Sequence, residues 1–433
     1  MKPNKTERTK AFGLVSAVLL GIGSMVGAGI FIVIGQAGAL AGNAVWLSFV
    51  LGGIAALLSG YSLAKLAVAY PSRGGIVEYV VQCYGEGFFS GSVGVLFYLS
   101  QLIAIAAVAK SFGTYAATFF HGGTLSVNLF ALGIVGAFTA INLIGASGVA
   151  KSENIIVFIK IAILTLFTVA ALRYVDPSLL AQSKMPPISA MFYAVGLTFF
   201  AYQGFSVITN TVEDMKDAPH TVLKAMLYAI LIVALLYVAT SVAVLGNLPL
   251  EKVIETKDYA LAEAAKPIFG EWGFKLMAAT ALLATASAIN ATLYAATEIG
   301  YTLAKEGNLP REYTYNVFHS YEGLVISALL IVPMILFFDL SQVTTIAALV
   351  VLIIQGLVHV GHLFRLKTTG AHSFLIFLAA AAMFTIDGLT MYKMSETIPH
   401  LGFYLLGAFG IAFFIEAALQ LGRHRIVKAQ CDT

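Results

Sequence analysis

The most unusual ionisable residue in the sequence is a lysine inside an apolar segment. Lys160 lies in the run IIVFIKIAIL, residues 155–164, and the nearest acidic residue of the same stretch is Glu153. An intramembrane charge is costly and marks a functional position by default. Burial also lowers the pKa of a lysine, so such a group can exchange a proton near neutral pH. The alternative is a lysine that extends its ammonium to the membrane interface.

Glycines gather in another apolar segment, and a glutamine–glycine pair interrupts a third. Residues 21–38 contain Gly21, Gly23, Gly27, Gly29, Gly35 and Gly38, and Gln203-Gly204 lies inside residues 189–211. A glycine weakens a helix by about 1 kcal/mol relative to alanine. We therefore expect both helices to be interrupted. Close packing of helices on small residues, and a glutamine bonded to a neighbouring helix, are the alternatives.

A helix that breaks inside a membrane can bind charge without a charged side chain. Its second half begins with unpaired N–H groups at the positive end of the helix dipole, which suits a carboxylate. Its first half ends in unpaired carbonyl groups, which suit an ammonium. An α-amino acid carries both groups on one carbon, so a pair of such breaks predicts an amino-acid site.

Other kinds of chemistry find no support in the sequence. The eight histidines do not cluster, and His359-x-x-His362 has no acidic partner, so we expect no metal site. No nucleophile constellation, phosphate loop or carboxylate pair is present, which argues against an enzyme and against a cofactor. Of the 433 residues, 59% are hydrophobic and 11% are charged, against about 25% charged in soluble proteins. This composition excludes a soluble enzyme, a disordered chain and a nucleic-acid binder.

The apolar residues form twelve stretches, each continuous and too long for the strand of a membrane barrel. We therefore expect an all-α polytopic protein in a lipid bilayer, with a single membrane domain of twelve transmembrane helices. The expected spans are residues 14–40, 45–69, 88–119, 127–148, 155–172, 189–211, 222–245, 272–304, 324–338, 344–364, 374–391 and 401–421. The connection 246–271 is the longest, and we expect short surface helices in it.

The basic residues predict the orientation. With the N-terminus in the cytoplasm, sixteen of the 25 Lys and Arg fall on the cytoplasmic side and seven outside, which leaves Lys110 and Lys160 within spans. This predicts a cell-membrane protein with both termini in the cytoplasm. Lys110 lies about two turns from the outer end of its helix, and we expect it to extend to the interface. We expect Glu298 to be interfacial.

The two interruptions lie five helices apart, a spacing typical of transporters built from inverted repeats. Residues 12–173 and 188–367 would be the repeats, and residues 371–421 would form two additional helices.

Several stretches together resemble the amino acid–polyamine–organocation (APC) transporter superfamily. They are the segment GAGIF at 27–31, the aromatic-x-x-x-Gly-Phe pattern from Phe200 to Phe205, and residues 205–213, 246–249, 284–294 and 303–310. The last four, with the stretch around Lys160, are similar to an archaeal proton-coupled member of broad amino-acid specificity. The resemblance covers most of the chain.

The resemblance implies a fold of 5+5 inverted repeats plus two helices, with substrate held by backbone. It implies that Ala28, Gly29 and Ile30 offer N–H groups to the carboxylate, and that Met25, Phe200 and Gln203 offer carbonyls to the amino group. Phe200 would also close over the substrate. The implied substrate site is Met25, Gly27, Ala28, Gly29, Ile30, Phe200, Ala201, Gln203 and Gly204.

The resemblance also assigns a role to Lys160, whose ammonium would replace a coupling sodium ion beside Gly23 and Ser287. Ala286 stands where a sodium-coupled relative has a second hydroxyl, and Ser206 replaces the glutamate of exchangers for cationic substrates. We therefore expect a proton-coupled symporter for small neutral amino acids, with no metal or other cofactor. A proton-independent exchanger, a sodium-coupled symporter and a membrane-embedded amino-acid sensor remain the alternatives.

Overall fold

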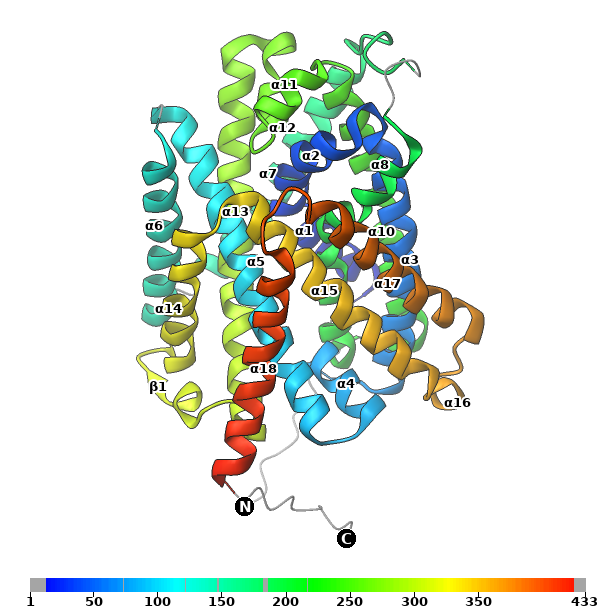
Figure 1. The fold of residues 1–433 in the computed structure, drawn as a ribbon, viewed down its shortest axis with the longest axis vertical. Coiled ribbons are helices and arrows are strands. Elements are labelled where there is room, and N and C mark those ends of the chain that lie inside the picture. The colour runs from blue at the N-terminus through cyan, green and yellow to red at the C-terminus, as the bar shows by residue number, and fades with distance from the viewer. Residues whose placement is uncertain are drawn as a thin grey trace.

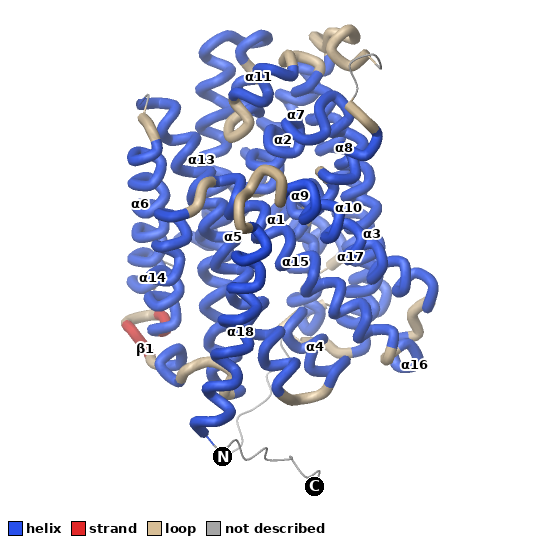
Figure 2. The backbone as a smooth tube through the Cα atoms, in the orientation of Figure 1, coloured by secondary structure: helices blue, strands red, loops and turns tan. Residues whose placement is uncertain are grey.

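The protein is a bundle of helices that run roughly along one long axis (Figures 1 and 2). The computed structural model describes residues 13–72, 74–120, 122–145, 148–181, 186–215 and 217–423. Within these ranges the only strands are two of two residues each, which pair as one antiparallel hairpin. Helices satisfy their own backbone hydrogen bonds, which is the requirement that a lipid surrounding imposes.

The first half of the chain contains seven α-helices and one short 3₁₀ helix among the described residues. They are α1 (Leu14–Met25), α2 (Ala28–Ala41), η1 (Gly42–Ala44), α3 (Val45–Ala69), α4 (Ile76–Tyr84), α5 (Phe88–Phe120), α6 (Thr124–Ile144) and α7 (Gly148–Leu172).

The second half has more short elements. They are α8 (Ile188–Tyr193), α9 (Val195–Ala201), η3 (Gln203–Asp214), α10 (Ala218–Leu245), α11 (Leu250–Glu255), α12 (Ala260–Glu263), α13 (Lys266–Glu306), η4 (Arg311–Thr314), β1 (Asn316–Val317), β2 (Ser320–Tyr321), α14 (Glu322–Phe337), α15 (Leu340–Leu363), α16 (Leu366–Thr369), α17 (Ser373–Met394) and α18 (Leu401–Arg423).

The described residues contain ten helical segments that are long and apolar enough to cross a membrane. One of them, Gly29–Ala69, joins α2 and α3, and two further apolar helices, Leu14–Met25 and Glu322–Phe337, are shorter. The predicted all-α membrane fold is confirmed. The count of twelve spans stays a prediction, because α1 and α14 are each shorter than the roughly 20 residues that a span requires.

The helices form an inner group and an outer group. In α5 and α15, 83% of the most apolar window is buried inside the protein, against 17% in α6 and 22% in α18. The outer helices direct large apolar side chains outward, among them Phe403 and Phe414 of α18. Apolar surface turned away from the protein is what a lipid surrounding favours. The inner helices are therefore the ones that position a central site.

The connections divide between the two ends of the bundle. Figure 1 shows α11 and α12 at one end and α4, α16 and the β1–β2 hairpin at the other. The end that faces the cytoplasm stays a prediction. Some of the basic residues used for that prediction lie outside the described residues: Lys2, Lys5, Arg8, Lys10, Arg73, Lys184, Lys216, Arg425 and Lys428.

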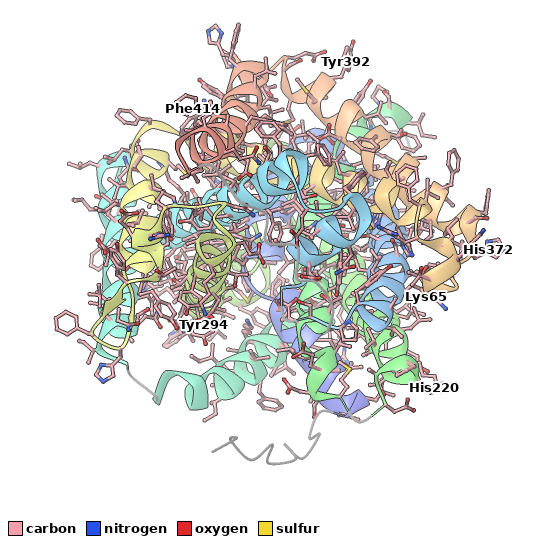
Figure 3. All side chains as sticks on the ribbon, turned by 90° about the horizontal axis from the view of Figure 1, so that it is seen from below. Lys65, His220, Tyr294, His372, Tyr392 and Phe414 are labelled. Carbon is pink, nitrogen blue, oxygen red and sulfur yellow. The ribbon has the colours of Figure 1, made fainter. Side chains whose placement is uncertain are left out.

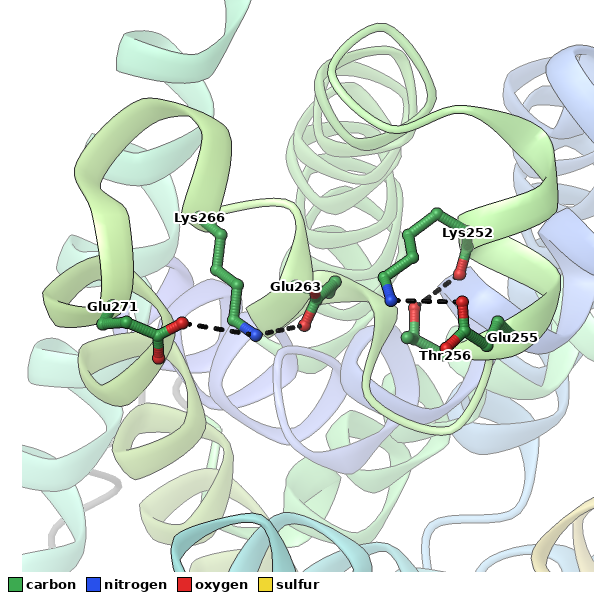
Figure 4. A network of polar contacts seen from close by, with 6 residues as sticks. All are labelled: Lys252, Glu255, Thr256, Glu263, Lys266 and Glu271. Carbon is green, nitrogen blue, oxygen red and sulfur yellow. Dashed lines mark hydrogen bonds and ion pairs between the residues drawn. The ribbon is translucent and has the colours of Figure 1, made fainter.

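The long connection after α10 forms short helices, as predicted. Lys266 lies between Glu263 at 3.1 Å and Glu271 at 3.5 Å, and Lys252 pairs with Glu255 at 3.1 Å (Figure 4). The Lys252–Glu255 pair is exposed, and such a pair stabilises a protein by about 0–1 kcal/mol, whereas Glu263 is buried. The firmer contact is with α2, where the carbonyl of Lys257 lies against Gly35. The loop is thereby placed directly over the second half of the first broken segment.

Candidate functional site

The glycine-rich first segment is interrupted at the predicted place. Helix α1 ends at Met25, and α2 begins at Ala28. Gly27, between them, has φ −112° and ψ −122°, which is not helical, and no side chain caps the start of α2. The first N–H groups of α2, from Ala28 onward, have no carbonyl one turn before them. The predicted break is confirmed, and it leaves the first N–H groups of α2 without partners in their own helix.

The second interruption lies at Tyr202, one residue before the predicted glutamine. Helix α9 ends at Ala201, and the chain continues from Gln203 to Asp214 as the 3₁₀ helix η3. A 3₁₀ helix of this length is unusual, because its hydrogen-bond geometry is poorer than that of an α-helix. The second break is therefore a change of helix type within one continuous segment.

The two breaks touch each other through backbone. A Cβ atom at Gly29 would lie 2.7 Å from the carbonyl oxygen and 2.8 Å from the Cα of Ala201. A Cβ atom at Gly204 would collide with the backbone of Ser24 and lie 2.5 Å from the nitrogen of Met25. Backbone atoms cannot move aside as a flexible side chain can. Glycine is therefore required at both positions, since only glycine lets the start of α2 meet the end of α9 and the start of η3 meet the end of α1.

A tyrosine that the sequence analysis did not single out connects the two breaks. The hydroxyl of Tyr237 in α10 donates to the carbonyl of Met25 at 2.6 Å and lies 3.4 Å from the carbonyl of Ala201. The side chain is fully buried. These are the last carbonyls of α1 and α9, which have lost their helical partners. Tyr237 thus gives its one hydroxyl proton to the carbonyl at the end of α1 and lies beside the carbonyl at the end of α9.

The carbonyl of Met25, which the resemblance assigned to the substrate's amino group, already accepts two hydrogen bonds. The second comes from the backbone N–H of Gly27 at 2.8 Å. A carbonyl oxygen has two lone pairs. An ammonium bound at Met25 would therefore have to replace or share one of these donors.

The intramembrane lysine lies beside the first break. Lys160 in α7 is 2% exposed, so it does not extend to the interface. Its Nζ atom lies 4.0 Å from the position of a Cβ on Gly27, and the Cβ of Ala288 in α13 lies 3.5 Å from the same point. Gly23, one turn earlier, faces Val157 of α7. The ammonium, the break and α13 therefore meet at Gly27, and Ser287 is buried next to Ala288.

Lys110, in contrast, was predicted wrongly. It is 4% exposed and donates to Oδ1 of Asn128 in α6 at 2.7 Å. The neighbouring helix supplies the acceptor within the protein, so the side chain has no need to reach the interface. Glu298 lies on the surface near the end of α13, as expected.

The predicted glutamine belongs to a buried polar cluster. Its Oε1 accepts a hydrogen bond from Nε2 of Gln355 in α15 at 2.9 Å, whereas its own Nε2 is buried without a hydrogen-bond partner among the described residues. Phe200, the predicted closing aromatic, is half-buried in α9, and Ile30 is fully buried in α2. Of the side chain of Ala28 nothing is described. No group of three potential metal-ligating side chains occurs among the described residues.

Comparison with known proteins places the chain among transporters. A family model described as amino acid permease matches residues 12–420. The chain is 33% identical over 412 residues to the uncharacterized protein MJ0609 of Methanocaldococcus jannaschii, which covers 94% of this chain and 95% of that protein. It is 36% identical to the inner membrane transport protein YbaT of Escherichia coli over 79% and 81% of the two chains. It is 25% identical to the branched-chain amino acid permease BcaP of Bacillus subtilis over 70% and 68%.

A methyl group at the contact between the breaks should destabilise the protein. Gly29→Ala places a Cβ against the backbone of Ala201, and overpacking of this kind costs about 1–3 kcal/mol. We expect a lower melting temperature of the purified protein in detergent. Gly133→Ala is the matched control, because no atom lies within 4 Å of a Cβ there. Equal melting temperatures for the two variants would contradict the close contact.

Removal of one hydroxyl should loosen the same contact. Tyr237→Phe leaves the carbonyls of Met25 and Ala201 without this donor, and a lost buried hydrogen bond costs about 0.5–1.5 kcal/mol. We expect Tyr237→Phe to melt at a lower temperature than the wild type. The control is Tyr228→Phe on the same helix, where the side chain is 49% exposed. If both tyrosine variants melt like the wild type, the Tyr237 hydroxyl does not connect the breaks.

Proposed function

The chain belongs to the amino acid permease family, and from this premise we propose that it is a proton-coupled symporter for small neutral L-amino acids. Family membership makes it a multi-pass membrane transporter of amino-acid type and argues against an enzyme. Coupling to protons, the range of substrates and the roles of individual residues are parts of the proposal. The observation that carries it is the position of the buried Lys160 ammonium beside Gly27, at the break of the first segment.

The substrate is proposed to bind across the two breaks. Its carboxylate would meet the free N–H groups at the start of α2, from Ala28 to Ile30, at the positive end of the helix dipole. Its amino group would meet the carbonyl ends of α1 and α9, which Tyr237 now occupies. Phe200 would cover the side facing α11 and α12. A site built from backbone dipoles suits every α-amino acid, so selectivity rests on the side chains around it.

Lys160 is proposed to carry the coupling proton. As an ammonium it attracts the carbonyl ends of α1 and so holds α7 against α1 and α13. Loss of the proton removes this attraction and releases α7 from both helices. The two protonation states thus favour different arrangements of the bundle, which is the requirement for alternating access driven by a proton gradient. No metal or other cofactor enters the mechanism.

The proposal includes the architecture and the orientation. The segments 12–173 and 188–367 would be inverted repeats, since each begins with an interrupted helix. The end of the bundle with α4 and α16 would face the cytoplasm, as the distribution of basic residues indicates. Relatives named as transporters of branched-chain amino acids and as a serine/threonine exchanger support small neutral substrates.

Uptake by reconstituted protein tests the coupling. In proteoliposomes with an inward proton gradient, we expect small neutral amino acids to accumulate faster than when a protonophore has collapsed the gradient. Replacing external sodium by choline should leave the rate unchanged. Equal rates with and without the proton gradient would remove the symport proposal. A rate that depends on internal amino acid alone would establish the exchanger, and one that depends on sodium would establish the sodium symporter.

Substitution of the lysine tests its role. Lys160→Ala removes the titratable group, and we expect uptake to lose its response to external pH while binding of substrate, measured by scintillation proximity, stays within about threefold. Lys110→Ala is the matched control, because Lys110 is an equally buried lysine that bonds Asn128 of α6. We expect the control to keep the pH response. A normal pH response in Lys160→Ala would contradict the role of Lys160 as the proton carrier.

A further inference from the structure

Two cavities lie side by side where the β1–β2 hairpin meets α6 and α13. Their volumes are about 290 and 300 Å³. Phe318 and His319, the two residues between β1 and β2, line both of them. Figure 3 views this end of the bundle from below and labels Tyr294 of α13, which lines the first cavity. The cavities therefore adjoin and form two compartments of one site.

The two compartments differ in chemistry. Apart from the shared pair, the described residues of the first, the polar compartment, are Tyr294, Glu298, Asn316, Ser320 and Tyr321. Those of the second, the apolar compartment, are Ala140, Leu143 and Ile144 near the end of α6. A molecule that fills both compartments must be polar at one end and hydrocarbon at the other.

The apolar compartment belongs to the surface that faces lipid. Ile144 is 71% exposed, and only 17% of the most apolar window of α6 is buried inside the protein. Helix α6 has 21 residues, a length of about 30 Å, which matches the hydrocarbon layer of a bilayer. Because α6 ends at Ile144, the compartment lies at the edge of this layer. The polar compartment beside it is therefore placed where phospholipid headgroups begin.

The polar compartment carries one negative charge. Glu298 is the one Asp, Glu, Lys or Arg among the described residues that line either compartment. Within the described part of the chain it forms no ion pair, and the ammonium of Lys305 on the same helix lies over the ring of Tyr301 instead, 4.5 Å from its centroid. A carboxylate in this position attracts a cation. Asn316 and Ser320 add uncharged hydrogen-bond donors, which suit a phosphate.

The phenylalanine shared by the compartments has an uncommon backbone conformation. Phe318 has φ +51° and is 86% exposed, and a positive φ is rare for a bulky side chain. The N–H of His319 donates to the carbonyl of Leu143 at 3.0 Å, which fixes the hairpin to the end of α6. Residues under such strain gather at binding sites. Here the strained residue supplies the common wall of both compartments.

We propose that this site binds one phospholipid with a primary ammonium headgroup, phosphatidylethanolamine, from the leaflet at this end of the bundle. Its ammonium would donate charge-assisted hydrogen bonds to Glu298. Its phosphate would accept hydrogen bonds from Asn316 and Ser320. The first part of an acyl chain would fill the apolar compartment along Leu143. The ring of Phe318 would lie between the headgroup and the chain.

The hydrogen-bonding side chains distinguish this headgroup from others. The trimethylammonium group of phosphatidylcholine has no N–H to donate, so it can meet Glu298 only as a charge. Phosphatidylglycerol has no cation and would bring a negative charge towards the carboxylate. Free O-phosphoethanolamine carries the same charged groups as the proposed lipid, but it has no hydrocarbon to bury in the apolar compartment.

Native mass spectrometry of the full-length protein in detergent, with each lipid added in turn, tests the site. We expect the wild type to retain one phosphatidylethanolamine, with an affinity about tenfold above that for phosphatidylcholine or phosphatidylglycerol. Glu298→Gln should remove this preference, because it removes the charge that the ammonium meets. Glu312→Gln is the matched control, since it changes an exposed carboxylate at the same end that lines neither compartment.

Three results would overturn the proposal. They are equal retention of the three lipids by the wild type, undiminished retention of phosphatidylethanolamine by Glu298→Gln, and equally strong binding of free O-phosphoethanolamine. The last would show that the apolar compartment has no part in binding. Retention is read without transport, so the result is independent of the proposed function.

A second variant separates binding from folding. Phe318→Asn replaces the shared wall by a residue that adopts a positive φ readily. We expect its melting temperature in detergent to equal or exceed that of the wild type, while its affinity for phosphatidylethanolamine falls about fivefold. Unchanged affinity in Phe318→Asn would contradict the common wall and, with it, a site of two compartments.

Discussion

The structure depends on the contact between two interrupted helices inside an apolar bundle. A break in hydrocarbon leaves N–H and carbonyl groups that water cannot satisfy, and each such group costs several kcal/mol. Here the two breaks approach each other directly at Gly29 and Gly204, and Tyr237 donates to the carbonyl end of α1 beside that of α9. The surrounding helices hold this contact. The start of α2 has no side-chain cap, and in the proposed function the substrate's carboxylate would meet it.

The sequence predicted those parts of the site that are local. A glycine cluster, a glutamine–glycine pair and a lysine among isoleucines stand out within a few residues, and the structure places both breaks and Lys160 where they were expected or one residue away. Tyr237 and Gln355 could not be found in this way. Their partners Met25 and Gln203 are 212 and 152 positions distant in the chain. The local sequence around a tyrosine or a glutamine in an apolar helix does not show whether such a distant partner exists.

The two buried lysines show the same limit of sequence-based prediction. Lys160 and Lys110 both lie in apolar helices, and depth along the helix predicted that Lys110 would reach the interface. The decisive factor is the neighbouring helix, since Asn128 supplies an acceptor to Lys110 whereas the region around Gly27 receives Lys160. The prediction of helix length from the sequence has a similar limit. The apolar pattern continues through Val26 and Gly27, so it gives one span where the backbone forms two short helices.

Charge at the centre of the protein is confined to groups that can lose it. The described residues at the breaks offer backbone dipoles and one ammonium, and the buried chain of hydrogen bonds from Gln203 into α15 and α3 consists of neutral hydroxyls, amides and imidazoles. Such groups can reverse their hydrogen bonds without a change of volume, whereas a fixed ion pair cannot. Lys160 meets the first break, and Gln203 begins the second. In the proposed function, the proton on Lys160 would therefore act on the first half of the binding site, through attraction to the carbonyl end of α1.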